Sequence, residues 1–148
     1  KEKARQEKLE KKKAQEDLTV DFLAVGDNIA HGPIYKSGQG EGDVWNYDHI
    51  YEPVKKDIEE ADLSLVTQET IFVEDRNNVS GYPAFGTPVE IGDALVNAGF
   101  DVIAHSSNHV LDKGTKSIEY TLDWWEQTHP EIEVLGIHKQ QKKQREFL

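Results

Sequence analysis

Short apolar runs alternate with longer amphipathic stretches along most of this 148-residue chain. Short apolar runs that end in polar or glycine residues are typical of buried strands, and apolar residues three or four positions apart are typical of helices. Strands that alternate with helices favour a parallel sheet with helical crossovers. The sequence therefore predicts an α/β fold of this kind. The predicted strands lie within residues 18–28, 63–70, 100–109 and 131–137, and the predicted helices within 48–62, 89–100 and 114–128.

Local signals support the predicted helices and the loops between the elements. Ile50, Val54 and Ile58 recur at four-residue spacing, so they form one apolar face of a helix. Gly99 follows the second helix, where a residue without Cβ tolerates the left-handed conformation that ends many helices. Residues 29–47 and 74–88 are rich in glycine and proline, so we predict long loops there.

Charge is distributed unevenly along the chain. It contains 28 Asp and Glu against 17 Lys and Arg, and many of the basic residues lie near the two ends. Leu9 is the one sizeable apolar residue of residues 1–17, so we predict a charged linker there, before a domain that begins at residue 18. The basic tail from residue 139 predicts the start of another helix or a loop.

The acidic body of the chain limits its partners. A negative surface repels phosphate backbones, so we expect no nucleic acid, whereas divalent cations and cationic groups fit better. A plain solvated acidic surface is the alternative interpretation. The absence of cysteine excludes disulfides and thiolate chemistry, and no phosphate-loop motif indicates nucleotide binding. No methionine occurs, even at position 1, so we expect the natural start upstream of Lys1.

Polar side chains follow three consecutive predicted strands. Asp27 follows the first strand, Glu69 the second, and Asn108 and His109 the third. Ligands bind beyond the carboxyl ends of parallel strands, so we expect these side chains to share one site. Carboxylate and amide oxygens bind hard divalent cations, and an adjacent histidine can serve as a general acid. Each residue alone has a plainer interpretation as a turn cap or surface group, but together they predict a site.

Three further residues are supporting candidates. Asp112 lies three positions after His109, where it either orients the imidazole or caps the next helix. His31 lies four positions after Asp27, and His105 belongs to the polar cluster that ends the third strand. We expect the remaining histidines to be structural or exposed.

Three sequence blocks resemble a known family. VGDN after the first strand, QET after the second, and GYPAFGTPVEIGDALVNAGFDVIAHSSNHVLDKG are similar to the bacterial capsule-synthesis family called CapA, which is linked to poly-γ-glutamate. The resemblance runs from about Val20 to Gly136. That family is related to the calcineurin-like metallophosphoesterases, so the resemblance implies part of an α/β/β/α sandwich. Residues 18–148 would be the N-terminal part of the domain, with the C-terminal part absent.

The resemblance also implies a set of site residues. A divalent ion (Mn, Mg, Fe or Zn) would be held by Asp27, Glu69 and Asn108. Glu69 and His109 would be the catalytic groups, with support from Asp112.

The chain departs from the family pattern at three positions. Thr67 stands where the family usually has Asn, and Ser107 replaces the first Asn of the pair before the histidine. His31 lies four residues after Asp27, rather than the two of a true metallophosphoesterase. These departures argue against a complete two-metal centre.

The resemblance implies a role in capsule or poly-γ-glutamate biosynthesis. The protein would be extracytoplasmic, with a membrane anchor upstream of Lys1, and would hydrolyse a phosphoester by a metal-dependent reaction. The expected partners are an anionic polymer or phosphoester substrate and other capsule-synthesis membrane proteins. The alternative is a non-catalytic envelope protein that binds polymer or partner proteins on the same fold.

Overall fold

A parallel sheet forms the centre of the fold. The structure is a computed structural model that describes residues 2–16, 19–42 and 44–139. Within these residues four strands pair in the order β1-β2-β3-β4, and every neighbouring pair is parallel. The predicted α/β fold with a parallel sheet and helical crossovers is therefore confirmed. The strands are β1 (Phe22–Asn28), β2 (Leu63–Gln68), β3 (Val102–Ala104) and β4 (Glu133–Leu135).

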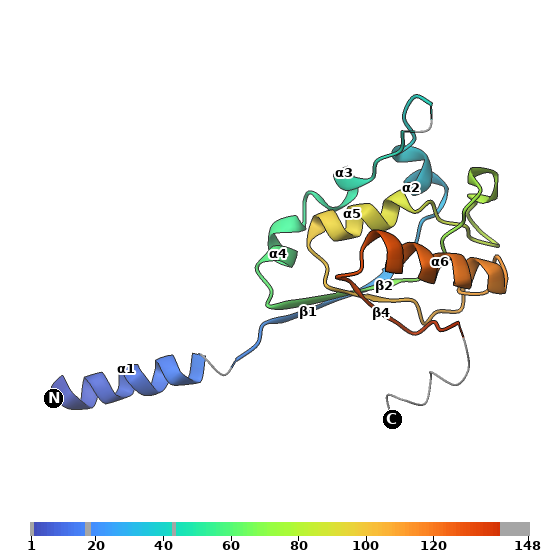
Figure 1. The fold of residues 1–148 in the computed structure, drawn as a ribbon. Coiled ribbons are helices and arrows are strands. Elements are labelled where there is room, and N and C mark those ends of the chain that lie inside the picture. The colour runs from blue at the N-terminus through green and yellow to red at the C-terminus, as the bar shows by residue number, and fades with distance from the viewer. Residues whose placement is uncertain (1, 17–18, 43, 140–148) are drawn as a thin grey trace.

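Helices cover one face of the sheet, as Figure 1 shows. Val66 and Ile103 of the sheet are buried in one core with Leu95 and Trp125 of the helices. This packing explains why the helices need apolar residues on one side alone. The helices are α2 (Gly32–Ser37), α3 (Asp48–Tyr51), α4 (Lys55–Glu59), η1 (Arg76–Asn78), α5 (Glu90–Ala98) and α6 (Thr115–Thr128), preceded by α1 (Glu2–Glu16).

The other face of the sheet carries exposed apolar side chains. Phe22 is 57 %, Leu63 40 % and Leu135 39 % exposed. Phe22 pairs with Leu63, and Leu135 pairs through Ala104 with Thr67, which shares a face with Leu63 because it lies four residues further along β2. Contiguous exposed apolar patches mark surfaces that pack against something else.

The predicted helix over residues 48–62 is wrong in one respect, because two short helices, α3 and α4, replace it. Pro53 lies between them. Proline has no N–H to continue the helical ladder, and its ring collides with the carbonyl of the residue four positions earlier. The predicted loop over 29–47 also contains α2, whose first turn includes Pro33, a position where the fixed φ of proline favours a helix.

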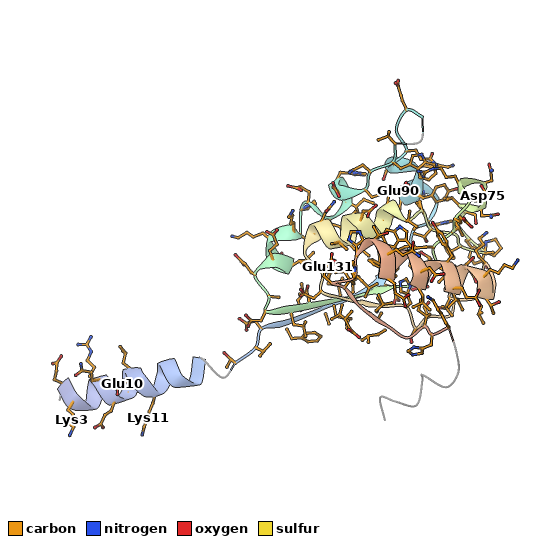
Figure 2. The ribbon with its side chains drawn as sticks, in the orientation of Figure 1. Lys3, Glu10, Lys11, Asp75, Glu90 and Glu131 are labelled. Atoms are coloured by element: carbon orange, nitrogen blue, oxygen red, sulfur yellow. The ribbon has the colours of Figure 1, made fainter. Side chains whose placement is uncertain are left out.

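The N-terminal segment forms a helix that extends away from the sheet (Figure 1). Figure 2 shows Lys3, Glu10 and Lys11 projecting from α1 at a distance from the sheet. Its role as a linker stays a prediction. None of the helices in the described part of the chain is long and apolar enough to cross a membrane. The tail predicted from residue 139 lies, from residue 140 on, outside the described residues.

Gly99 ends α5 in a left-handed conformation, with φ of 102°. We expect Gly99→Ala to lower the free energy of unfolding by about 1–2 kcal/mol, because a Cβ disfavours this conformation. The added Cβ would also lie 3.2 Å from Glu59 Cγ. Urea unfolding measures the change. Gly32→Ala is the control, because a Cβ there meets nothing within 4 Å; equal losses in the two variants would contradict the prediction.

Candidate functional site

A bulge at the end of β1 sets the direction of Asp27. Val25 pairs with Val66, yet Asp27 pairs with Thr67, so the register shifts by one residue at Gly26. Without the shift, Asp27 would face the buried core side of the sheet, as Val66 does. A bulge re-aims the side chains that follow it. Asp27 therefore lies beside Thr67 and is exposed.

Glu69 follows β2 directly and lies next to Asp27. Its backbone N–H donates to the carbonyl of Asn28, 3.2 Å away, which ties the ends of the two strands together. Glu69 is 8 % exposed. Burial raises the pKa of the Glu69 carboxyl, and the charge of Asp27 and a hydrogen bond shared with Asp27 raise it further, whereas His109 lowers it. Two carboxyl groups this close favour a proton or a cation between them.

His109 faces Glu69 from the end of β3. Its Nε2 lies 3.6 Å from Glu69 Oε1, which is too long for a direct hydrogen bond. Its Nδ1 lies 2.7 Å from Asp112 Oδ2. An N–H on Nδ1 would donate to this carboxylate and leave the Nε2 atom free towards Glu69.

Asp112 orients the imidazole and does not cap the following helix. The residue before α6 is Gly114, and no side chain caps that helix. Asp112 Oδ2 instead accepts from the backbone N–H of Phe85, at 2.7 Å, as well as contacting His109. One carboxylate thus holds both the imidazole and the loop before α5.

The rings of Phe85 and His31 pack beside His109. Phe85 is buried, and its ring contacts His109 edge-on with 4.6 Å between centroids and His31 with 5.6 Å. His31 Nδ1 accepts from the backbone N–H of Tyr82 at 3.3 Å. Gly81 permits this approach, because a Cβ there would lie 2.2 Å from His31 Nδ1. The glycine- and proline-rich loop therefore lies against the site.

Asn108 and His105 lie less close to the carboxyl pair. Asn108 is exposed, and its Oδ1 accepts from the Ser107 hydroxyl at 3.2 Å. The described contacts do not join it to Asp27 or Glu69. His105 is 1 % exposed and accepts from Trp125 Nε1 at 3.0 Å, so it lies in the core behind the site.

The residues present fit a divalent ion in part. Asp27 and Glu69 offer carboxylate oxygens, and His109 Nε2 has no partner closer than Glu69 in the contacts given above. Oxygen-rich sets suit Mg²⁺ and Mn²⁺, and an added imidazole suits Zn²⁺ or Fe²⁺. Among the described residues, however, no group of three or more His, Cys, Asp or Glu is arranged to hold a metal.

Two residues that support the site were missed by the sequence reasoning. Asn28 directly follows Asp27, and Gln68 directly precedes Glu69. Asn28 Nδ2 donates to Gln68 Oε1 at 2.6 Å. An amide residue directly beside each carboxylate, at the end of a predicted buried strand, was the available signal. A hollow of about 490 Å³ lies elsewhere, between α6 and β4, and includes none of the predicted site residues.

The raised pKa of Glu69 predicts that ionisation of this carboxyl lowers the free energy of unfolding, a cost that depends on pH. Below the ordinary carboxyl pKa, folded and unfolded chains both bind the proton, and the cost vanishes. As the pH rises past it, the unfolded chain releases its proton first, so the free energy of unfolding falls until folded Glu69 ionises. We expect Glu69→Gln to remove this fall, so the stability gain of the variant over wild type grows as the pH rises above the ordinary carboxyl pKa.

Urea unfolding in the presence of a chelator, at several pH values, measures this gain. Glu52→Gln serves as the control, because Glu52 is exposed on the surface. A gain that is the same at every pH, or one that Glu52→Gln reproduces, would contradict the expected role of burial and of Asp27.

Comparison with known proteins identifies the family. No curated protein matches the chain significantly. The family described as bacterial capsule synthesis protein PGA_cap matches residues 21–148, which include all four strands and every residue of the candidate site. This match covers most of the chain and agrees with the predicted resemblance. The chain therefore belongs to the bacterial capsule synthesis protein PGA_cap family.

Proposed function

We propose that this chain provides a metal-dependent, phosphoesterase-like hydrolase site for capsule or poly-γ-glutamate synthesis at the cell envelope. The observation that carries the proposal is the placement of Asp27 and Glu69 within hydrogen-bond reach of each other, with His109 facing Glu69. Carboxylates that repel each other are stabilised by a cation, and a nearby imidazole supplies proton transfer.

The proposed roles follow from the chemistry of each group. Asp27 and Glu69 hold a divalent ion (Mn, Mg, Fe or Zn), and Asn108 adds an amide oxygen. The ion supplies Lewis acidity and an activated water. In its protonated form His109 carries a proton at Nε2 for the leaving group, while Asp112 accepts from Nδ1 and fixes the direction of the imidazole. Glu69 also serves as a base for water.

The proposed substrate is a phosphoester or an anionic polymer. So acidic a chain needs a cation to approach a polyanion, which agrees with the proposed ion. The proposed location is extracytoplasmic, with a membrane anchor upstream of Lys1 and other capsule-synthesis membrane proteins as partners. These proposals rest on the family and on the charge of the chain.

We further propose that a second sheet packs on the open face, giving the α/β/β/α sandwich expected from the resemblance. Phe22, Leu63 and Leu135 support this proposal, because their exposed side chains form an apolar surface opposite the helices. The C-terminal part of the family domain would supply that sheet.

A second candidate function is non-catalytic binding of polymer or partner proteins. Two observations favour it: Asn108 is not joined to the carboxyl pair, and no third His, Cys, Asp or Glu completes a metal cluster among the described residues. In that case His109 and Asp112 would serve to hold the loop that carries Phe85.

Activity and metal binding of the full-length protein separate the two functions. We expect Mn²⁺-dependent hydrolysis of bis(p-nitrophenyl) phosphate. Asp27→Asn should weaken Mn²⁺ binding by at least about 100-fold, beyond the roughly 10–100-fold typical of residues that only orient a ligand. His109→Ala should leave Mn²⁺ bound and lower kcat by about 10²–10⁴-fold, as expected for lost proton transfer.

Exposed residues of the same types serve as controls. Asp57→Asn and His49→Ala change exposed side chains and should alter neither measurement. Tight polymer binding that is indifferent to Asp27→Asn and His109→Ala, without any turnover, would establish the binding function and overturn the hydrolase.

A further inference from the structure

Hydrogen-bonded side chains join the ends of β1 and β2 directly beneath the site. The Tyr51 hydroxyl donates to Asn28 Oδ1 at 2.9 Å, and Asn28 Nδ2 donates to Gln68 Oε1 at 2.6 Å. Gln68 Nε2 then donates to the Thr70 carbonyl at 2.7 Å. Each amide thus has a single orientation that satisfies both of its neighbours.

The same network continues to β3 and α6. A ring N–H of His105 donates to the backbone carbonyl of Gln68, and His105 Nε2 accepts from Trp125 Nε1 at 3.0 Å. On the other side, the hydroxyls of Thr70 and Thr87 lie 2.5 Å apart. The network therefore has members in β1, β2, α3 and α6, and His105 directly follows β3. We refer to Tyr51, Asn28, Gln68, Thr70, Thr87, His105 and Trp125 as the buried polar network.

Members of the network alternate with the site residues along the chain. Asn28 follows Asp27, and Gln68 precedes Glu69. Because consecutive side chains of an extended strand point to opposite faces, the network faces the helices while Asp27 faces the open side. The Glu69 N–H also donates to the Asn28 carbonyl, so the backbone at the two carboxylates is tied together.

Burial makes this arrangement costly to disturb. Gln68, Thr70 and Thr87 are 0 % exposed, and His105 is 1 % exposed. A buried donor or acceptor that loses its partner costs about 1–3 kcal/mol, so every member resists displacement of its neighbour. Residues that hold a ligand in this indirect way contribute to metal affinity without touching the metal.

We propose that Gln68 is a positioning residue of the site, one that fixes the spacing between the Asp27 and Glu69 carboxyl groups by locking the end of β1 to the end of β2. This inference rests on the proposed function, since the spacing matters because the two carboxylates share an ion. Gln68 does not touch the ion or substrate, and it acts through Asn28 and through the backbone of Glu69.

Two titratable members of the network, Tyr51 and His105, keep their protonation states over a wide pH range. Burial raises the pKa of the Tyr51 hydroxyl to about 12, although its hydrogen bond with Asn28 lowers it in part. Burial lowers the pKa of His105 to about 3, against the opposing effect of its hydrogen bond to Gln68. Tyr51 therefore remains a donor and His105 remains neutral, so one hydrogen-bond pattern persists.

A pair of substitutions on one strand tests the proposal in the full chain. Gln68→Met preserves approximate size and removes the amide. Ser64→Ala is the matched control, because Ser64 is also 0 % exposed and hydrogen-bonded, to the Gly99 carbonyl and to Asp101, at the opposite end of β2. We expect both variants to lose stability, but only Gln68→Met to weaken Mn²⁺ binding, by about tenfold.

Amide hydrogen exchange without metal gives a second readout. Exchange at the Glu69 N–H should accelerate in Gln68→Met relative to the other β2 amides and stay unchanged, relative to them, in Ser64→Ala. If Gln68→Met does not fold, Tyr51→Phe replaces it, because it removes one hydroxyl and leaves Asn28 Oδ1 without its donor.

The outcomes separate the two hypotheses. If Gln68→Met has the same Mn²⁺ affinity and the same exchange rate at the Glu69 N–H as Ser64→Ala, the positioning role of Gln68 is overturned. If the wild-type protein binds no Mn²⁺, the proposed function fails, and the exchange experiment still decides: acceleration confined to Glu69 supports the lock between β1 and β2, and uniform acceleration overturns it.

Discussion

The pairing of β1 with β2 holds the candidate site together, because it keeps the Asp27 and Glu69 carboxyl groups side by side at the edge of the sheet. Asp27 and Glu69 repel each other when both are ionised, and burial of Glu69 adds to the cost. A free loop would relieve this repulsion by moving the groups apart. Here the Asn28–Gln68 hydrogen bond and the Glu69–Asn28 backbone hydrogen bond prevent that movement. The repulsion between the two carboxylates is therefore held in place by the hydrogen-bonded residues beneath them, and functional sites often combine strain with a rigid support in this way.

The strand ends could be predicted from sequence because their signals are local. Apolar runs stop at Gly26-Asp27 and before Glu69, and the ends of parallel strands must share an edge. Gly99 likewise marked the end of α5 by its own conformational freedom. The split between α3 and α4 was also local, since Pro53 lies inside the predicted helix, but the four-residue apolar spacing on both sides of it outweighed the proline signal.

The supporting network could not be predicted in the same way, because its partners are distant in sequence. Asn28 and Gln68 are 40 positions apart, and His105 and Trp125 are 20 apart. Sequence pattern indicates that a strand is buried, but not which polar side chain meets which. His105 shows the consequence. Its place in a polar cluster suggested a supporting role at the site, whereas its burial against Trp125 gives it a place in the core beneath the site.

The bulge at Gly26 brings Asp27 to the open face of the sheet. It turns Asp27 to the same side as Thr67, the side on which Phe22 and Leu63 are exposed. A layer that covered those apolar residues would also approach Asp27 from that side. Burial there would lower the local dielectric and strengthen any interaction between a cation and the two carboxylates. A second sheet of the kind proposed above would therefore cover the exposed apolar side chains and enclose Asp27 at the same time.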